Sequence, residues 1–344
     1  MPIAYGTVLI TGANSFYAAA IMDRLVPLGI RIHGTVRSET AVSPLKRRYG
    51  DMIRIFVTPN ICLLDAFMEA VHGCDGIFHV ASPFRPNFKD AKTEVLDPAI
   101  KGTLAALNAA ARTVSVKRVV MTSSVAAVIN QMHELGFHRP GYTYTEADWN
   151  PVTYEEASES QNFHAVYTAS KALAEKAAWA FMEDQSRHFD LVTINPCQTW
   201  GTYGQNIRST EAMNFSNSDL SRLIDGKEKS VPNCQMPWVT DINAVADAHV
   251  AALLTPEARG RYLVATASLD FQEVVDIMHS NFPQAEWIRN VPKGQPGVRQ
   301  PKDFFALDNT RSQHELRVRY RSVENIVIDF CKQYQDHRKA LAKL

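Results

Sequence analysis

The chain has 344 residues, of which 46% are hydrophobic and 21% charged, and this composition is typical of a globular protein with one two-lobed unit or two domains. Its 36 basic and 36 acidic residues balance, which argues against nucleic-acid binding, and no apolar run is long enough to span a membrane. Five scattered cysteines without a C-x-x-C pair predict neither a metal site nor a disulfide framework.

Short apolar segments alternate with helical patterns over the first 200 residues. The predicted strands are residues 7–10, 30–36, 53–57, 77–80, 118–122 and 191–194. The predicted helices are residues 15–28, 62–71, 94–112 and 168–187. Because the strands are apolar throughout, we expect them to be buried on both faces in a parallel sheet between helices. The sequence therefore predicts an α/β fold with a Rossmann-type, doubly wound parallel sheet.

The pattern loosens after Pro196. Glycine, asparagine, serine and proline recur between residues 201 and 237, with one helix expected near 218–224. Residues 238–254 have the pattern of a strand end and a helix that return to the sheet. We therefore predict a sheet domain of residues 1–200 plus about 237–255, and a smaller, partly interleaved C-terminal lobe of residues 201–236 and 256–344.

The first predicted strand runs into the turn Gly12-Ala13-Asn14-Ser15-Phe16. Dinucleotide-binding folds use glycines in this turn so that the backbone can approach the pyrophosphate, and the following helix offers free N–H groups to it. Ser15 stands at the middle position, where glycine is usual, so its side chain is expected to crowd the pyrophosphate unless its hydroxyl donates a hydrogen bond. A plain strand-turn-helix with a serine N-cap is the alternative.

Arg37 and Ser38 follow the second predicted strand. Dinucleotide folds carry here either an acidic residue that bonds the ribose of NAD, or an arginine that accommodates the 2′-phosphate of NADP. The sequence therefore favours NADPH, with Ser38 adding a hydrogen bond. A solvated loop arginine is the alternative.

Tyr167 and Lys171 lie four residues apart and share one face of a predicted helix. A tyrosine has an ordinary pKa near 10, and a neighbouring ammonium group is expected to lower it, which suits a proton donor in carbonyl reduction. Ser124 ends the fifth predicted strand and faces the same crevice, where it is placed to bond the substrate carbonyl. An ordinary surface pair and a serine-rich turn are the alternatives.

Nine stretches in this order form a recognisable pattern. They are VLITGAN (8–14), GTVRS (34–38), HVASPF (79–84), KGTL (101–104), VKRVV (116–120), TSSVA (122–126), WNPVTYE (149–155), SKALAEKAAW (170–179) and NP (195–196). The pattern resembles the extended short-chain dehydrogenase/reductases, above all the fungal NADPH-dependent aldehyde and ketone reductases and the plant dihydroflavonol and cinnamoyl-CoA reductases.

The resemblance implies roles for the residues that match. Ser124, Tyr167 and Lys171 would form a catalytic triad in which Tyr167 protonates the carbonyl oxygen, and the sheet domain would bind NADP while the lobe binds the substrate. The implied cofactor-binding residues are Gly12, Asn14, Ser15, Phe16, Arg37, Ser38, Asn60, Ile61, Ala81, Ser82, Pro83, Thr122, Tyr167, Lys171, Pro196 and Thr199. Asn60 departs from the family, which usually has an aspartate that contacts the adenine at this position, although an amide oxygen could still accept that bond.

The sequence indicates the substrate pocket less specifically than the cofactor site. The candidates from position are Phe84, Val125, Gln131, Tyr203, Met236 and Trp238, and each is equally consistent with ordinary core or lid packing. Their mixture of aromatic and aliphatic groups favours an uncharged or aromatic ketone or aldehyde, and an intermediate of secondary metabolism is a candidate.

The expected protein is therefore an NADPH-dependent ketoreductase that acts on a small-molecule carbonyl compound, as a monomer or homodimer. A related epimerase, dehydratase or cyclase of the same fold is the alternative, as is a non-catalytic NADP(H)-binding protein. The cysteines and the absence of room for a signal peptide predict a cytoplasmic protein. The terminal Ala342-Lys343-Leu344 resembles a peroxisomal signal, and a frayed basic helix end is the alternative reading.

Overall fold

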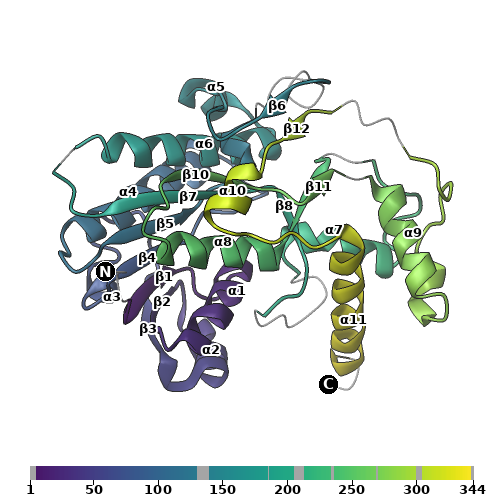
Figure 1. Ribbon diagram of the computed structural model, residues 1–344, viewed down its shortest axis with the longest axis horizontal. Helices are drawn as coiled ribbons and strands as arrows, with labels where there is room; N and C mark the ends of the chain where they lie inside the picture. Colours follow the sequence, from purple (N-terminus) through teal and green to yellow (C-terminus); the bar gives the residue numbers. More distant parts are fainter. Residues whose placement is uncertain are drawn as a thin grey trace.

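The computed structural model (Figure 1) describes residues 5–129, 139–184, 186–204, 213–233, 236–268, 270–299 and 304–341. The strands are β1 (Thr7–Thr11), β2 (Arg31–Val36), β3 (Ile53–Val57), β4 (Gly76–His79), β5 (Arg118–Thr122), β6 (Thr143–Tyr144), β7 (Asp190–Pro196), β8 (Gln198–Trp200), β9 (Trp238–Asp241), β10 (Gly260–Val264), β11 (Ala267–Ser268) and β12 (Ala306–Leu307). The helices are α1 (Phe16–Leu25), α2 (Val42–Tyr49), α3 (Met68–Val71), α4 (Asp97–Ala111), α5 (Tyr154–Glu159), α6 (Phe163–Phe181), α7 (Phe215–Ile224), α8 (Ile242–Leu254), α9 (Phe271–Asn281), α10 (Thr310–Glu315) and α11 (Val323–Leu341). None of the helices in these ranges is long and apolar enough to cross a bilayer.

A seven-stranded parallel sheet forms the centre of the first lobe, in the order β10-β7-β5-β4-β1-β2-β3. Its middle strands are buried on both faces, as the uniformly apolar sequences predicted: β5 and β4 are buried along their whole length. Helices α1, α2 and α8 cover one face, and α3, α4 and α6 cover the other (Figure 1). The predicted doubly wound Rossmann-type sheet is confirmed.

The strand order reverses at β1, which pairs with β2 on one side and with β4 on the other. In open α/β sheets, ligands bind beyond the carboxyl ends of the strands at such a switch point. The ends of β1, β4 and β5 therefore mark where a site is expected.

The smaller lobe packs α7, α9 and α11 around its own apolar core, beside the small sheet β11-β9-β8 (Figure 1). The seventh strand of the main sheet, β10, comes from beyond the boundary expected near residue 255. The exact division of the chain into two domains stays a prediction.

Several local predictions differ from the structure. Helix α6 begins at Phe163, five residues before the predicted start, because the side chain of Asn162 caps it by accepting from the Ala165 amide at 3.2 Å. The predicted helix over 62–71 is reduced to α3, since the Asn60 side chain accepts from the Cys62 amide at 2.9 Å and holds the chain in a turn.

Candidate active site

The turn after β1 brings the backbone of two strands into contact. Gly12 has a φ of +69°, and a Cβ atom there would lie 3.2 Å from the Cα atom of Ala81, just after β4. Gly12 also donates from its amide to the hydroxyl of Thr35 at 3.3 Å, on β2. A side chain at position 12 would therefore be strained and would crowd Ala81, so the glycine keeps α1 close to the switch point.

Ser15 caps helix α1. Its backbone is extended (φ −89°, ψ 166°) and its hydroxyl oxygen accepts from the Ala18 amide at 3.4 Å. The position therefore needs no glycine conformation, and the hydroxyl faces a helix amide of the protein itself. The amides at the first two helical positions have no partner within a helix by geometry and remain available to an anion. Of the neighbouring predicted residues, Asn14 is exposed and Phe16 is buried in the core of the smaller lobe.

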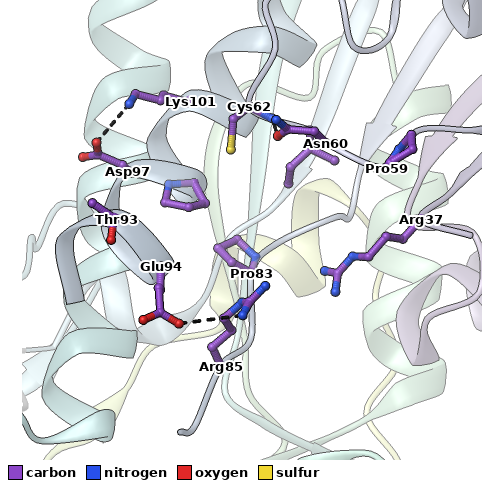
Figure 2. A pocket seen from close by; sticks show the side chains of 12 residues that line it. Arg37, Pro59, Asn60, Cys62, Pro83, Arg85, Thr93, Glu94, Asp97 and Lys101 are labelled. Carbon is purple, nitrogen blue, oxygen red and sulfur yellow. Dashed lines mark hydrogen bonds and ion pairs between the residues drawn. The ribbon is translucent and has the colours of Figure 1, made fainter. Parts of the chain in front are cut away.

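A pocket of 570 Å³ opens where the segments after β2, β3 and β4 meet helix α4 (Figure 2). It brings together four of the predicted cofactor-binding residues, namely Arg37, Asn60, Ile61 and Pro83. The other residues that line it are Pro59, Cys62, Arg85, Thr93, Glu94, Asp97, Pro98 and Lys101, and sequence reasoning assigned none of these to the site. A usable signal was Gly102 on α4, because a Cβ atom there would lie 2.9 Å from the end of the Ile61 side chain, which would have to shift.

Three cations of this pocket differ in their pairing. Arg85 lies 3.7 Å from the carboxylate of Glu94, and Lys101 donates to Asp97 at 2.9 Å. Arg37 is exposed and points into the pocket (Figure 2), and no hydrogen bond or ion pair to it is found in the part of the chain that the structure describes. Arg37 is therefore the cation best placed to receive an added anion.

The other cofactor-binding residues predicted near this pocket are exposed or partly buried. The Ser38 hydroxyl is exposed and bonds the Thr40 hydroxyl at 2.8 Å. Ser82 is exposed, and Ala81 is partly buried. The Asn60 amide oxygen already accepts from Cys62, so an adenine would have to share it or use the amide nitrogen.

Helix α6 carries Tyr167 and Lys171 on one face and is tied to the end of β5. The Lys171 ammonium group donates to the backbone carbonyl of Thr122 at 2.9 Å. Burial lowers the pKa of Lys171 to about 8, and the carboxylate of Glu175 opposes that shift. Lys171 is thus mostly charged at neutral pH. Its ammonium group lies at the last residue of β5, two residues before Ser124.

Burial raises the pKa of Tyr167 to about 12. This corrects the expectation that Lys171 lowers it, because loss of hydration on burial disfavours the charged phenolate and is the cause of the shift. No hydrogen bond to the Tyr167 hydroxyl is present among the described residues. The phenol is therefore protonated at neutral pH and has its proton available.

Ser124 is the second residue after β5 and is partly exposed. Its hydroxyl oxygen accepts from the Ala126 amide at 3.1 Å, and its carbonyl accepts from the side chain of Asn195 at 3.1 Å. Because the hydroxyl accepts from the backbone, its own hydrogen is free to be directed elsewhere.

A buried carboxylate lies behind these groups. Glu175 is fully buried, one helical turn after Lys171, and accepts from Thr193 at 2.9 Å, from Asn195 at 2.7 Å and from Arg261 at 2.7 Å. It also accepts from the hydroxyl of Ser123. These bonds fix the positions of α6, β7, β10 and the end of β5 relative to one another. Glu175 and Arg261 were not predicted from the sequence as supports of the site.

Thr199 and Pro196 are less accessible than expected. Thr199 is fully buried, and its hydroxyl accepts from Tyr17 at 2.9 Å and donates to the Cys197 carbonyl at 3.0 Å. Pro196 is buried at the end of β7. Tyr17, which was not predicted, is the partly exposed member of the Tyr17–Thr199 pair.

The predicted substrate residues fall into three places. The Phe84 ring lies against Tyr167, with centroids 5.7 Å apart. Val125, Met236 and Trp238 pack into one apolar cluster near β10. Tyr203 instead belongs to the core of the smaller lobe, where its hydroxyl bonds the His337 ring at 2.8 Å, so its side chain serves packing. Gln131 lies outside the described residues, as does the C-terminal 342–344 segment.

The model of the NAD dependent epimerase/dehydratase family matches residues 8–265, three quarters of the chain. The chain belongs to this family. Its membership confirms the resemblance to the extended short-chain dehydrogenase/reductases.

Several members of the family resemble the chain over most of its length. The NADPH-dependent methylglyoxal reductase of Saccharomyces cerevisiae is 32% identical over 95% of this chain and 97% of its own length. A cinnamoyl-CoA reductase of Medicago truncatula is 34% identical over 85% of each chain. Yeast methylglyoxal/isovaleraldehyde reductase, solved with NADPH, superposes with a TM-score of 0.85 at 29% identity, covering 97% of this chain and 99% of that one.

Proposed function

We propose that this chain is an NADPH-dependent carbonyl reductase that converts a ketone or aldehyde into an alcohol. The observation that carries the proposal is the pairing on α6 of a protonated Tyr167 with a buried Lys171, which is anchored to Thr122 at the switch-point edge of the sheet. A neutral phenol with an available proton is what a carbonyl oxygen needs as hydride reaches its carbon.

NADPH is the cofactor that the residues fit. Gly12 leaves a cradle that any side chain would fill, the first turn of α1 offers amides to a pyrophosphate, and Arg37 is an open cation for a 2′-phosphate. The pocket between Arg37 and Ile61 would take the adenosine end, with Asn60 at its rim. NADPH dependence in the names of relatives supports the same choice. Bound NADPH would supply the hydride.

The chain's own groups would handle the oxygen of the substrate. Tyr167 donates its proton to the carbonyl oxygen. Ser124 donates a hydrogen bond to the same atom, since its hydroxyl oxygen accepts from the Ala126 amide and its hydrogen stays free for the substrate. Lys171 donates one N–H to the Thr122 carbonyl and has two more N–H groups that can donate toward Tyr167 and the cofactor. Its charge stabilises the phenolate that remains after proton transfer.

The substrate would be an uncharged or aromatic ketone or aldehyde, and an intermediate of secondary metabolism is within this class. Phe84 against Tyr167 supports an apolar substrate. By their names, relatives act on methylglyoxal, isovaleraldehyde or cinnamoyl-CoA, which gives a first set of compounds to try.

The test is to mix the purified protein with NADPH and a panel of aldehydes and ketones, following the absorbance of NADPH and the alcohol formed. One mole of NADPH consumed per mole of alcohol supports reduction. Conversion of a substrate without net NADPH consumption would instead indicate an epimerase, dehydratase or cyclase. Binding of NADPH without turnover of any carbonyl would indicate a non-catalytic binding protein.

A further inference from the structure

Three phenylalanine rings gather beside Tyr167, and we call Phe84, Phe163 and Phe215 the aromatic cluster. They come from three distant segments: the stretch after β4, the first residue of α6 and the first residue of α7. Only Phe84 was expected near the substrate from sequence.

The rings of the aromatic cluster form a continuous surface that reaches Tyr167. Phe84 stands edge-on to Tyr167, with centroids 5.7 Å apart and planes at 77°, and edge-on to Phe163 at 5.2 Å and 86°. Phe163 lies 5.9 Å from Tyr167, one turn away on the same helix. Phe215 contacts Phe84 at 5.2 Å and Phe163 at 6.3 Å, so it forms the outer end of the cluster.

The cluster is unusually exposed for its composition. Phe84 is 43% exposed and Phe215 is 53% exposed, whereas most large apolar side chains of the two lobes are buried. Exposed aromatic surface costs free energy in water, roughly 25 cal/mol per Å². Apolar surface that is left open beside polar chemistry is a common feature of ligand sites, and here it adjoins the proton donor.

We propose that the aromatic cluster binds the aryl ring of an aryl aldehyde or aryl ketone, with the carbonyl directed at Tyr167. This rests on the proposed reductase function and names the substrate class of the same site. The rings of Phe84, Phe163 and Phe215 are perpendicular or tilted relative to one another, so they offer both faces and edges to a flat ring. An aryl ring would gain edge-to-face contacts with them, whereas a saturated ring of equal size would not. Phe163 and Phe215 are then specificity-determining residues.

The alternative role of these rings is to dock α7 of the smaller lobe onto α6. Docking alone would give contacts between the two helices without any preference for an aromatic substrate. The two roles therefore differ in substrate selectivity and not in stability.

The experiment compares phenyl methyl ketone with cyclohexyl methyl ketone, which have the same carbon skeleton and differ in aromaticity. The readout is the ratio of kcat/KM for the two ketones, because this ratio does not depend on the amount of folded enzyme. The variants are Phe163→Leu and Phe215→Leu. The matched control is Phe181→Leu, since Phe181 is a partly buried residue at the opposite end of α6.

We expect each variant of the cluster to lower the ratio of phenyl to cyclohexyl ketone by about 2- to 10-fold relative to the native protein, the size of one or two aromatic contacts. The change in the ratio cancels the different intrinsic reactivity of the two carbonyl groups. Phe181→Leu should leave the ratio unchanged. A ratio that the cluster variants do not lower would overturn the proposal.

Turnover and ring binding can be separated. If no carbonyl is reduced, the proposed function fails, and calorimetric titration of the NADPH-loaded protein with the two ketones still tests the cluster. Tighter binding of the phenyl ketone, weakened by Phe215→Leu, supports it. Equal binding of both ketones contradicts it.

Discussion

The Nζ atom of Lys171 lies 2.9 Å from the backbone oxygen of Thr122, and this bond joins the helix of the proposed proton donor to β5, which ends two residues before Ser124. A lysine has three N–H donors, so one can fix the geometry while the others serve the site. The relationship explains how residues more than 40 positions apart are held in one arrangement without a bound ligand.

Replacing Arg37 with glutamine should weaken NADPH binding by about 10- to 100-fold, because one charge-assisted hydrogen bond to the phosphate is lost. NADH binding should stay nearly unchanged, since NADH has no 2′-phosphate. Fluorescence titration measures both. Arg31→Gln is the matched control, because Arg31 is exposed at the first residue of β2, whereas Arg37 follows the last. Equal losses for the two nucleotides would contradict the role of Arg37.

Ser15 should act as a helix cap and not as an obstacle to the cofactor. Ser15→Ala should lower the free energy of unfolding by about 1 kcal/mol, and Ser15→Gly by only a few tenths. Denaturant unfolding checks both values. In Ser15→Gly, NADPH affinity should stay within about threefold of the native value, a change below 1 kcal/mol. Binding that tightens tenfold or more would show that the serine crowds the pyrophosphate.

Arg261→Met should destabilise the protein by about 3 to 5 kcal/mol, because it leaves the fully buried Glu175 carboxylate without its cation. Arg112→Met is the control: Arg112 pairs with Asp65 on the surface, where such pairs contribute about 0 to 1 kcal/mol. Urea unfolding of both variants gives the comparison. Similar small losses would mean that the network of Glu175 does not support the site.

Acid should destabilise the fold through its buried histidines. Burial lowers the pKa of His249 to about 4 and that of His79 to about 3, so between pH 6.5 and these values the unfolded chain binds more protons than the folded one. The contribution of these two histidines to the free energy of unfolding is therefore fully present above pH 6.5. It is lost as the pH falls, by up to about 1.4 kcal/mol per pH unit for each histidine.

His249→Gln should flatten this loss when unfolding is measured at pH 7.5 and pH 5. His72→Gln, which changes an exposed histidine, should leave the native slope unaltered. An unchanged slope in His249→Gln would mean that other groups control the acid response.

Sequence patterns predicted those features that depend on interactions between residues close together in the chain. The buried strands, the left-handed Gly12 turn and the shared helix face of Tyr167 and Lys171 all depend on residues close in sequence. Arg37 likewise follows directly from its place after β2.

Contacts between distant segments could not be predicted in this way. The Arg261–Glu175 pair joins residues 86 positions apart, and no periodicity marks either one. Tyr203 looked like a pocket residue from position, but it packs against Phe330 of α11. Phe163 and Phe215 meet Phe84 only because α6 and α7 are brought together by the whole fold.

The most direct test of the account is the rate of hydride transfer in Tyr167→Phe, measured in a single turnover with NADPH and a reducible carbonyl. The variant removes one hydroxyl whose hydrogen has no partner in the described protein, so it should fold and bind NADPH normally. We expect a loss of about 10²- to 10⁴-fold in the rate, the usual contribution of a positioned proton donor. A rate within a few-fold of the native protein, with NADPH bound, would contradict the assignment of Tyr167 and the mechanism built on it.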